Sequence, residues 1–143
     1  MFKIKFLETG SIKNDNILFA IIAARYKEKW IFVRHKERKT WEIPGGHREV
    51  SEDINRTAAR ELYEETGAKV FKLYPISLYS VEREGEESYG QLFCAEVEVL
   101  EKLPDSEIAE IQLFDSMPGE LTYPAIQPVL HDKAIAFLEA LRK

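Results

Sequence analysis

The sequence predicts an α/β (α+β) fold in which a mixed β-sheet lies between helices on opposite faces. Two observations predict it: apolar stretches typical of strands precede an amphipathic helical segment, and the same order of strands followed by a helix occurs again. The chain has 143 residues, of which 45% are hydrophobic. This length suits one domain with a sizeable core and is too short for two, so we expect a single domain over residues 1–143.

Four stretches in the first half of the chain predict strands, namely residues 1–6, 17–25, 30–34 and 41–43. The first alternates apolar and charged side chains, and the second and third are separated only by Lys27-Glu28-Lys29, which predicts a hairpin. The fourth meets Pro44-Gly45-Gly46. Because proline blocks strand pairing and glycine permits tight turns, we expect the backbone to turn there.

The next segment predicts a helix that ends near Gly67. Ser51 or Asp53 is suited to cap its start, and Gly67 is suited to close it. From Arg60 onward the sequence Arg-Glu-Leu-Tyr-Glu-Glu consists mainly of good helix formers. The apolar residues that should form its buried face stand at a spacing of four and are Ile54, Ala58 and Leu62.

The second half of the chain repeats the pattern of strands followed by a helix. Strands are expected over residues 70–81, 89–99 and 108–114. The last helix begins at Pro124, or at Pro128 after a separate turn, because proline fits a first helical turn and disrupts a helix interior. Its expected apolar stripe is Leu130, Ala134, Phe137, Leu138 and Leu141.

Charge and composition exclude several classes of function. The net charge of −5 argues against a broad nucleic-acid-binding surface, so we expect no double-stranded nucleic acid partner. No stretch approaches the roughly 20 apolar residues that cross a bilayer, and the first residues lack a signal-peptide pattern. We therefore expect a cytoplasmic protein without a membrane partner. Cys94 is the only cysteine, which excludes an internal disulfide, and its apolar neighbours predict a buried structural thiol.

Three glutamates share one face of the first predicted helix. Glu61, Glu64 and Glu65 are neighbours because they stand at positions i, i+3 and i+4. Like charges on one patch repel each other, and a bound divalent cation reverses that effect. Carboxylate oxygens are preferred ligands of Mg²⁺, which is commonly shared with substrate phosphates. A solvated helix face is the alternative interpretation.

The spacing of residues around these glutamates favours the metal site. Gly46 precedes Glu52 by six positions, Glu52 precedes Arg60 by eight, and Arg60-Glu61-Leu62 lead into Glu64-Glu65 and Gly67. This pattern resembles the signature of the Nudix hydrolases, G-x5-E-x7-R-E-U-x-E-E-x-G-U, in which U is apolar. The resemblance implies a Nudix fold, an α/β/α sandwich, over essentially the whole chain.

The resemblance also implies roles for the matched residues. Family members hydrolyse a nucleoside diphosphate linked to another group and use Mg²⁺ or Mn²⁺ held by the signature glutamates. Arg60 is expected to hold a glutamate by ion pairing, and Glu52 to form that salt bridge or to reach a metal through water. The expected metal ligands are Glu61, Glu65, Glu64 and the carbonyl of Gly45.

The signature does not fix the general base that deprotonates the attacking water. Glu64 or Glu65 could serve, and so could a glutamate on a later loop, as in many family members. On such a loop Glu107 is the first candidate and Glu110 the second, with solvated surface as the alternative for both.

Residues outside the signature are expected to contact the substrate. In the basic stretch over residues 34–39, Arg34 and His35 are the preferred phosphate contacts, because family members often carry an arginine there; a solvated turn is the alternative. His47 and His131 are interpreted as a loop and a structural side chain. A nucleobase needs an aromatic platform, although aromatic residues in strands usually belong to the core. The candidate platforms are Trp41, Tyr79, Tyr89 and Phe93.

Three functions are compatible with the sequence. Residues 41–46 and 121–128 resemble the MutT-like branch, bacterial 8-oxo-dGTP diphosphatase-like proteins, which implies cleavage of a nucleoside triphosphate to monophosphate and pyrophosphate. The second is hydrolysis of another substrate, such as ADP-ribose, a dinucleoside polyphosphate or a 5′-triphosphate RNA end. The third is a non-catalytic nucleotide-binding module, but such modules usually lose signature glutamates, which this chain retains. We expect a small-molecule nucleotide as partner and a monomer or homodimer.

Overall fold

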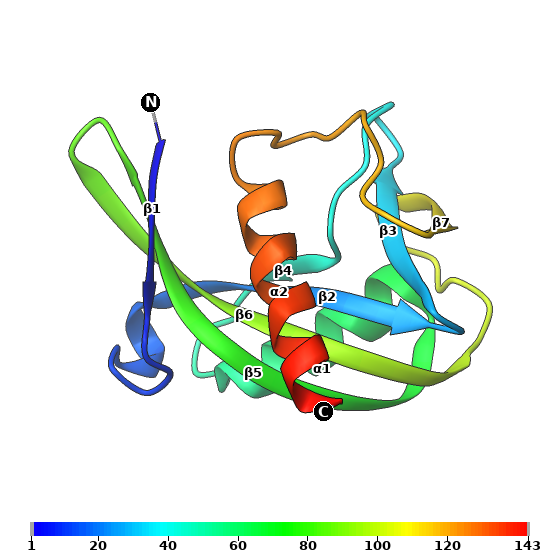
Figure 1. Cartoon of the computed structure of the whole chain (residues 1–143), viewed down its shortest axis with the longest axis horizontal. Helices are drawn as coiled ribbons and strands as arrows, with labels where there is room; N and C mark the ends of the chain where they lie inside the picture. The colour runs from blue at the N-terminus through cyan, green and yellow to red at the C-terminus, as the bar shows by residue number, and fades with distance from the viewer. Residues whose placement is uncertain (1, 143) are drawn as a thin grey trace.

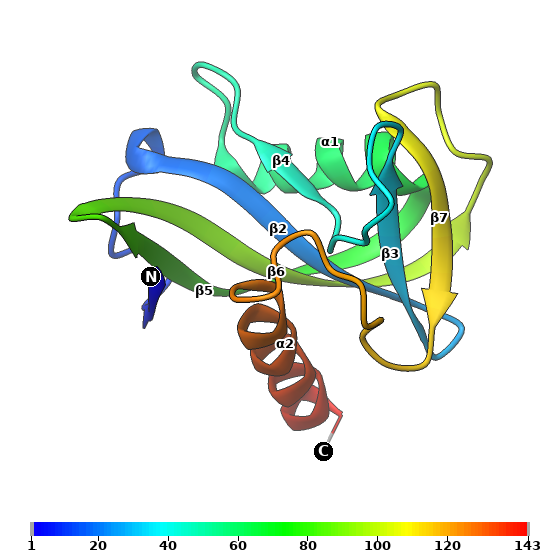
Figure 2. The ribbon, with the colours of Figure 1, turned by 90° about the horizontal axis from the view of Figure 1, so that it is seen from above.

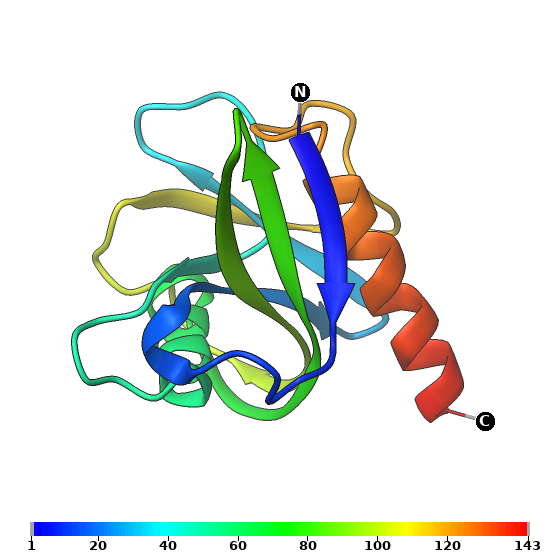
Figure 3. The same cartoon turned by 90° about the vertical axis from the view of Figure 1, so that its left-hand side faces the viewer.

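A seven-stranded mixed sheet forms the centre of the computed structural model, which describes residues 2–142 (Figure 1). Its strands are β1 (Phe2–Leu7), β2 (Ile17–Tyr26), β3 (Lys29–His35), β4 (Gly45–His47), β5 (Ala68–Arg83), β6 (Glu86–Leu100) and β7 (Ile108–Phe114). They lie in the order β1-β5-β6-β2-β3-β7, and β4 pairs with β2. β2 and β6 run parallel, whereas the other pairs are antiparallel. Figure 3 shows β1 at its edge of the sheet, beside the β5–β6 hairpin.

Two α-helices cover opposite faces of this sheet. They are α1 (Ile54–Thr66) and α2 (Gln127–Leu141), and a short 3-10 helix, η1 (Asn14–Asn16), precedes β2. Figure 2 shows α1 above the sheet and α2 below it. The expected mixed sheet between two helices is therefore confirmed. Within residues 2–142, neither helix is long and apolar enough to cross a membrane.

The ends and the buried face of α1 agree with the sequence. The Asp53 carboxylate caps the helix by accepting a 2.9 Å hydrogen bond from the Asn55 N–H. Gly67 ends it with a left-handed backbone at φ 83°, a conformation that glycine adopts without strain. The predicted apolar residues are buried against the sheet: Ile54, Ala58 and Leu62. This packing fixes the rotation of α1 about its axis and directs its glutamates toward a cleft.

The second helix packs a separate core on the other face of the sheet. It begins at Gln127 with Pro128 in its first turn, so Pro124 lies in the preceding turn. Its buried residues are Gln127, Leu130, His131, Ala134 and Leu138. Leu141 is 45% exposed, so the predicted apolar stripe ends earlier than expected, because the end of α2 runs away from the sheet (Figure 2).

The prediction of a strand over residues 41–43 is wrong. Trp41 and Glu42 form only isolated bridges, and the strand β4 lies instead at Gly45–His47, where a turn was expected. The reason is the close approach of two backbones. A Cβ atom on Gly45 would collide with the Ala20 carbonyl of β2, so glycine permits strand pairing here and does not serve a turn.

Candidate active site

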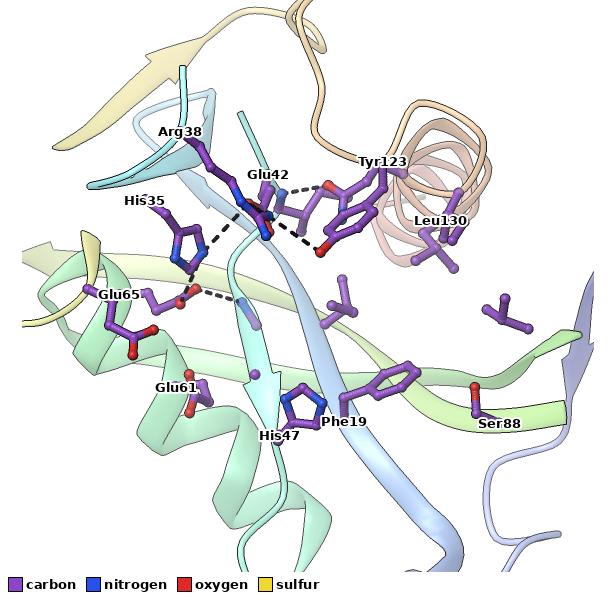
Figure 4. A pocket seen from close by; sticks show the side chains of 18 of the residues that line it. Phe19, His35, Arg38, Glu42, His47, Glu61, Glu65, Ser88, Tyr123 and Leu130 are labelled. Carbon is purple, nitrogen blue, oxygen red and sulfur yellow. Dashed lines mark hydrogen bonds and ion pairs between the residues drawn. The ribbon is translucent and has the colours of Figure 1, made fainter. Parts of the chain in front are cut away.

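A cleft of about 1040 Å³ lies between α1 and the segment that leads into α2 (Figure 4). Its charged lining includes Glu61, Glu65, Arg60, Glu107, His35, Arg38 and Glu42. Its apolar lining includes Phe19, Ile21, Val81, Ile126 and Leu130. Figure 4 shows the two α1 glutamates at one end and Leu130 and Ser88 toward the other. The cleft therefore offers an acidic end for metal and phosphate and an apolar region for a ring system.

Glu65 is a buried carboxylate at the acidic end. Its Oε1 accepts a 3.0 Å hydrogen bond from the Gly45 N–H, and its Oε2 lies 3.9 Å from His35 Nε2. Burial and, to a lesser extent, the neighbouring carboxylates of Glu61, Glu42 and Glu107 together raise the pKa of Glu65 to about 8, against the hydrogen bond from Gly45. A site with this much negative charge favours a cation.

Arg60 holds the other signature carboxylates together. Its guanidinium lies 2.7 Å from Glu52 Oε2 and 2.7 Å from Glu61 Oε1, and it donates a 3.1 Å hydrogen bond to the His47 carbonyl. The hydrogen bonds from Arg60, together with those from Thr57 and the Glu49 N–H, lower the pKa of Glu52 to about 2, against its partial burial. The expected ion pair between Arg60 and Glu52 is thus present in the structure, and Glu52 lies behind the cleft lining.

Glu61 occupies the space that a side chain at Gly46 would need. A Cβ atom on Gly46 would overlap the Glu61 carboxylate, so the glycine lets this carboxylate approach β4. Burial raises the pKa of Glu61, although the pairing with Arg60 opposes the increase. The two glycines therefore have distinct roles: Gly45 permits the close approach of β2, and Gly46 permits the close approach of Glu61.

Glu64 and Glu107 lie at a second, smaller cavity of about 410 Å³ beside the main cleft. Glu61 and Glu65 line this cavity as well. Glu64 is half-exposed and lies 3.5 Å from Arg60, and Glu107 is exposed on the segment before β7. The structure therefore brings Glu107 next to the α1 glutamates, as the sequence suggested.

Among the predicted substrate contacts, only some line the cleft. His35 does so, whereas Arg34 is directed to Glu110, at 2.9 Å, and to the Arg38 carbonyl, at 3.0 Å. Trp41 lies outside the lining and packs against Phe114 at 5.3 Å between ring centroids. Hence Arg34 supports the loop of residues 36–41.

The remaining aromatic candidates are placed as follows. Tyr79 lines the cleft but is almost fully buried, and Phe93 is a core residue on the α1 side. Tyr89 lies outside the lining and donates a 2.8 Å hydrogen bond to Glu87. Cys94 is buried as expected, and burial raises the pKa of its thiol to about 12.

The structure adds a group of cleft residues that the sequence analysis missed. Glu42 is buried and lies 3.0 Å from Arg38 and 3.6 Å from His35. Arg38 also donates a 3.4 Å hydrogen bond to the hydroxyl of Tyr123, an exposed aromatic residue (Figure 4). Gln127 lines the cleft as well. The sequence gives one indication of this group, because Arg38 belongs to the basic stretch of residues 34–39.

The residues at the acidic end fit a hydrated divalent cation. Within residues 2–142, no three His, Cys, Asp or Glu side chains are arranged to enclose a metal, because Glu61 is turned to Arg60 and Glu65 to the Gly45 N–H. Mg²⁺ usually retains several waters and binds one or two carboxylates together with substrate phosphates, so it needs no closed cage. The carboxylates of Glu61 and Glu65, whose pKa values are raised, supply the charge that such an ion compensates.

Comparisons with known proteins agree with this geometry. The NUDIX domain model matches residues 17–130. YtkD of Bacillus subtilis (strain 168), named as a candidate 8-oxo-dGTP diphosphatase, is 33% identical over 102 residues, which cover 71% of this chain and 64% of YtkD. The matched region thus spans slightly less than two thirds of that relative's length.

Solved structures show the same fold. A mutant of the Bacillus subtilis pyrophosphohydrolase BsRppH has a TM-score of 0.78 at 25% identity, over 94% of this chain and 90% of that chain. A UDP-X diphosphatase has a TM-score of 0.73 at 20% identity, over 92% of this chain and 68% of that chain, which is a likeness of fold alone. With the family match over most of its length and a glutamate-bearing helix at the cleft, the chain belongs to the Nudix family.

Proposed function

We propose that the protein is a Mg²⁺-dependent pyrophosphohydrolase that cleaves a nucleoside triphosphate, including oxidised purine forms such as 8-oxo-dGTP, to nucleoside monophosphate and pyrophosphate. The observation that carries the proposal is a pair of carboxylates, the buried Glu65 and the partly buried Glu61, at one end of a cleft of about 1040 Å³. A nucleotide fits such a cleft with its phosphates at this end. The likeness to YtkD supports the choice of a nucleoside triphosphate.

The metal ligands in this proposal are Glu61 and Glu65, with Glu64 and the Gly45 carbonyl completing the site. Mg²⁺, when bound there, neutralises charge on the phosphate oxygens and lowers the pKa of a bound water. Arg60 remains with Glu52 and holds the α1 glutamates in place. The Gly45 N–H orients the Glu65 carboxylate toward the cleft.

Glu107 is the proposed general base. It lines both the cleft and the smaller cavity with Glu61 and Glu65, and it is exposed to water at their edge. A carboxylate in this position accepts a proton from the attacking water and passes it to solvent. His35 and Arg38, which line the same cleft, are the proposed phosphate contacts.

The test is a hydrolysis assay with the purified protein in Mg²⁺. The panel contains dGTP, 8-oxo-dGTP, ATP, ADP-ribose, a dinucleoside polyphosphate and a 5′-triphosphate RNA, and the products are identified by chromatography. We expect nucleoside monophosphate and pyrophosphate from a triphosphate. Glu65→Gln should reduce kcat by about 100-fold or more, because it removes a charged metal ligand. Glu139→Gln, at an exposed glutamate of α2, is the matched control and should retain full activity.

Each alternative function has its own result in the same assay. Faster turnover of ADP-ribose, the dinucleoside polyphosphate or the RNA end would replace the triphosphate as substrate. Nucleotide binding without turnover of any substrate would make the protein a binding module. Equal turnover by Glu65→Gln and the wild type would remove Glu65 from the mechanism.

A further inference from the structure

Gln127 presents a fixed hydrogen-bond donor to the cleft. Its side chain is almost fully buried, lines the cleft, and accepts a 2.6 Å hydrogen bond at Oε1 from the Ile43 N–H. A backbone N–H can only donate, so the oxygen of the amide must face Ile43 and the nitrogen must face away from it. Within residues 2–142, the Gln127 Nε2 has no hydrogen-bond partner. The amide therefore offers its N–H groups, and not its oxygen, to a ligand.

Tyr79 presents a second unpaired polar group in the same cleft. Its ring packs 5.9 Å from that of Phe19, and a Cβ atom on Gly90 would collide with both rings. This burial leaves no free ring face for stacking and raises the pKa of the phenol, so the hydroxyl stays protonated. The hydroxyl has no hydrogen-bond partner among residues 2–142. Tyr79, which lines the cleft, can therefore offer a ligand its hydroxyl but no stacking surface.

We infer that Gln127 and Tyr79 determine which nucleobase the cleft accepts, and that Gln127 Nε2 donates a hydrogen bond to a ring carbonyl. Among purines, the favoured bases are therefore 6-oxopurines, such as guanine and hypoxanthine. Adenine carries an amino group in place of this carbonyl. Its N–H groups would face the N–H groups of Gln127, so no hydrogen bond could form. This inference rests on the proposed function, because that function places the phosphates at α1 and the base in the apolar part of the cleft.

The selectivity follows from the cost of an unpaired donor. A site that is built to hydrogen-bond a carbonyl rejects the analogue that lacks it, because a buried polar group then loses its partner. The hydroxyl of Tyr79 both donates and accepts, so it strengthens binding of any base with a polar edge. Gln127 therefore controls the preference, whereas Tyr79 contributes mainly to affinity.

The test compares the binding of IMP and AMP by isothermal titration calorimetry in saturating Mg²⁺. The two nucleotides differ only at the edge that carries the 6-oxo or 6-amino group. The wild type should bind IMP at least about tenfold more tightly than AMP. Gln127→Glu keeps an acceptor for the Ile43 N–H but turns an acceptor toward the cleft, so it should reverse this preference or reduce it to within about threefold. Gln112→Glu, at an exposed glutamine of β7, adds the same charge and should leave the preference unchanged.

Tyr79→Phe provides a variant that preserves the packing of the ring. It should weaken the binding of IMP by roughly 3- to 10-fold, the effect of one hydrogen bond, with an unchanged thermal unfolding profile. The inference is overturned if the wild type binds IMP and AMP equally, binds neither, or keeps its preference in a folded Gln127→Glu variant. If Gln127→Glu does not fold, unchanged IMP affinity in Tyr79→Phe overturns the two-residue assignment.

Failure of the proposed function gives a different result. A protein that prefers IMP but hydrolyses no triphosphate would contradict the proposed reaction and support the base preference. A protein that hydrolyses triphosphates of guanine and adenine with equal kcat/KM would do the opposite.

Discussion

Replacement of Arg60 by methionine should destabilise the protein by an amount that depends on pH. Arg60 is the shared partner of Glu52 and Glu61 at 2.7 Å and of Glu49 at 3.0 Å. Methionine keeps the aliphatic stem and a similar helix propensity, so the change mainly removes the charge. The carboxylates that remain repel each other and are only partly hydrated.

The pKa of Glu52 sets the magnitude. It falls from 4.5 to about 2 through its hydrogen bonds, chiefly with Arg60. At 1.36 kcal/mol per pKa unit, this corresponds to a ceiling of about 3.4 kcal/mol. Because the Arg60 side chain is 24% exposed and water screens the pair, we expect a loss of about 2 kcal/mol at pH 7. A lowered carboxyl pKa stabilises the fold above pH 4.5, and this stabilisation is lost as the pH falls toward 2.

Urea unfolding followed by tryptophan fluorescence measures this difference at pH 7 and at pH 3. The gap between wild type and Arg60→Met should shrink by more than half at pH 3, where the unfolded state protonates Glu52. Arg56→Met, at an exposed arginine of the same helix, should cost less than about 0.5 kcal/mol. The reasoning is refuted if both variants lose the same free energy at pH 7, or if the effect of Arg60→Met is equal at both pH values.

Three further predictions concern the glycine pair and the buried histidine. Gly46→Ala should change the unfolding free energy by less than about 1 kcal/mol but lower kcat/KM by about tenfold or more. The new methyl group displaces the flexible Glu61 carboxylate. A normal kcat/KM in steady-state kinetics would contradict this prediction. Gly45→Ala should lower the unfolding free energy by about 2 kcal/mol or more in urea, since its methyl group meets the rigid Ala20 carbonyl; an unchanged midpoint would oppose it. Burial lowers the pKa of His131 from 6.5 to about 4, so the protein should lose stability as the pH falls from 6.5 to 4. In His131→Leu, the melting temperature should depend less on pH over this range. An identical pH dependence in both proteins would contradict the role of His131.

The sequence predicted α1 and the clustering of its glutamates well because the necessary information is local. The cap at Asp53, the left-handed Gly67 and the apolar spacing of four residues all act within one helix. The salt bridge from Arg60 to Glu52 spans eight positions and follows from the same signature. Local rules of this kind hold whatever the rest of the chain does.

Contacts between distant segments were less predictable. Arg34 was expected at the phosphates, but the pairing of β3 with β7 places Glu110 directly beside it and removes it from the cleft. Arg38 and Tyr123 meet only because the segments before β4 and before α2 run side by side. No pattern of residues within either segment indicates this contact, so this part of the cleft was not predicted from the sequence.

The parallel pairing of β2 with β6 affects when the cleft can form during synthesis of the chain. β4 pairs with β2, and β2 in turn depends on β6, whose partners lie at residues 89–96. Parallel pairing of distant strands closes a long loop, and the chain entropy lost in this closure is offset only after the strands make contact. Such pairing therefore forms late in folding. A nascent chain that has only just exposed Ala68 contains every signature residue but has no cleft. Translation must therefore proceed well beyond the motif before the cleft can form.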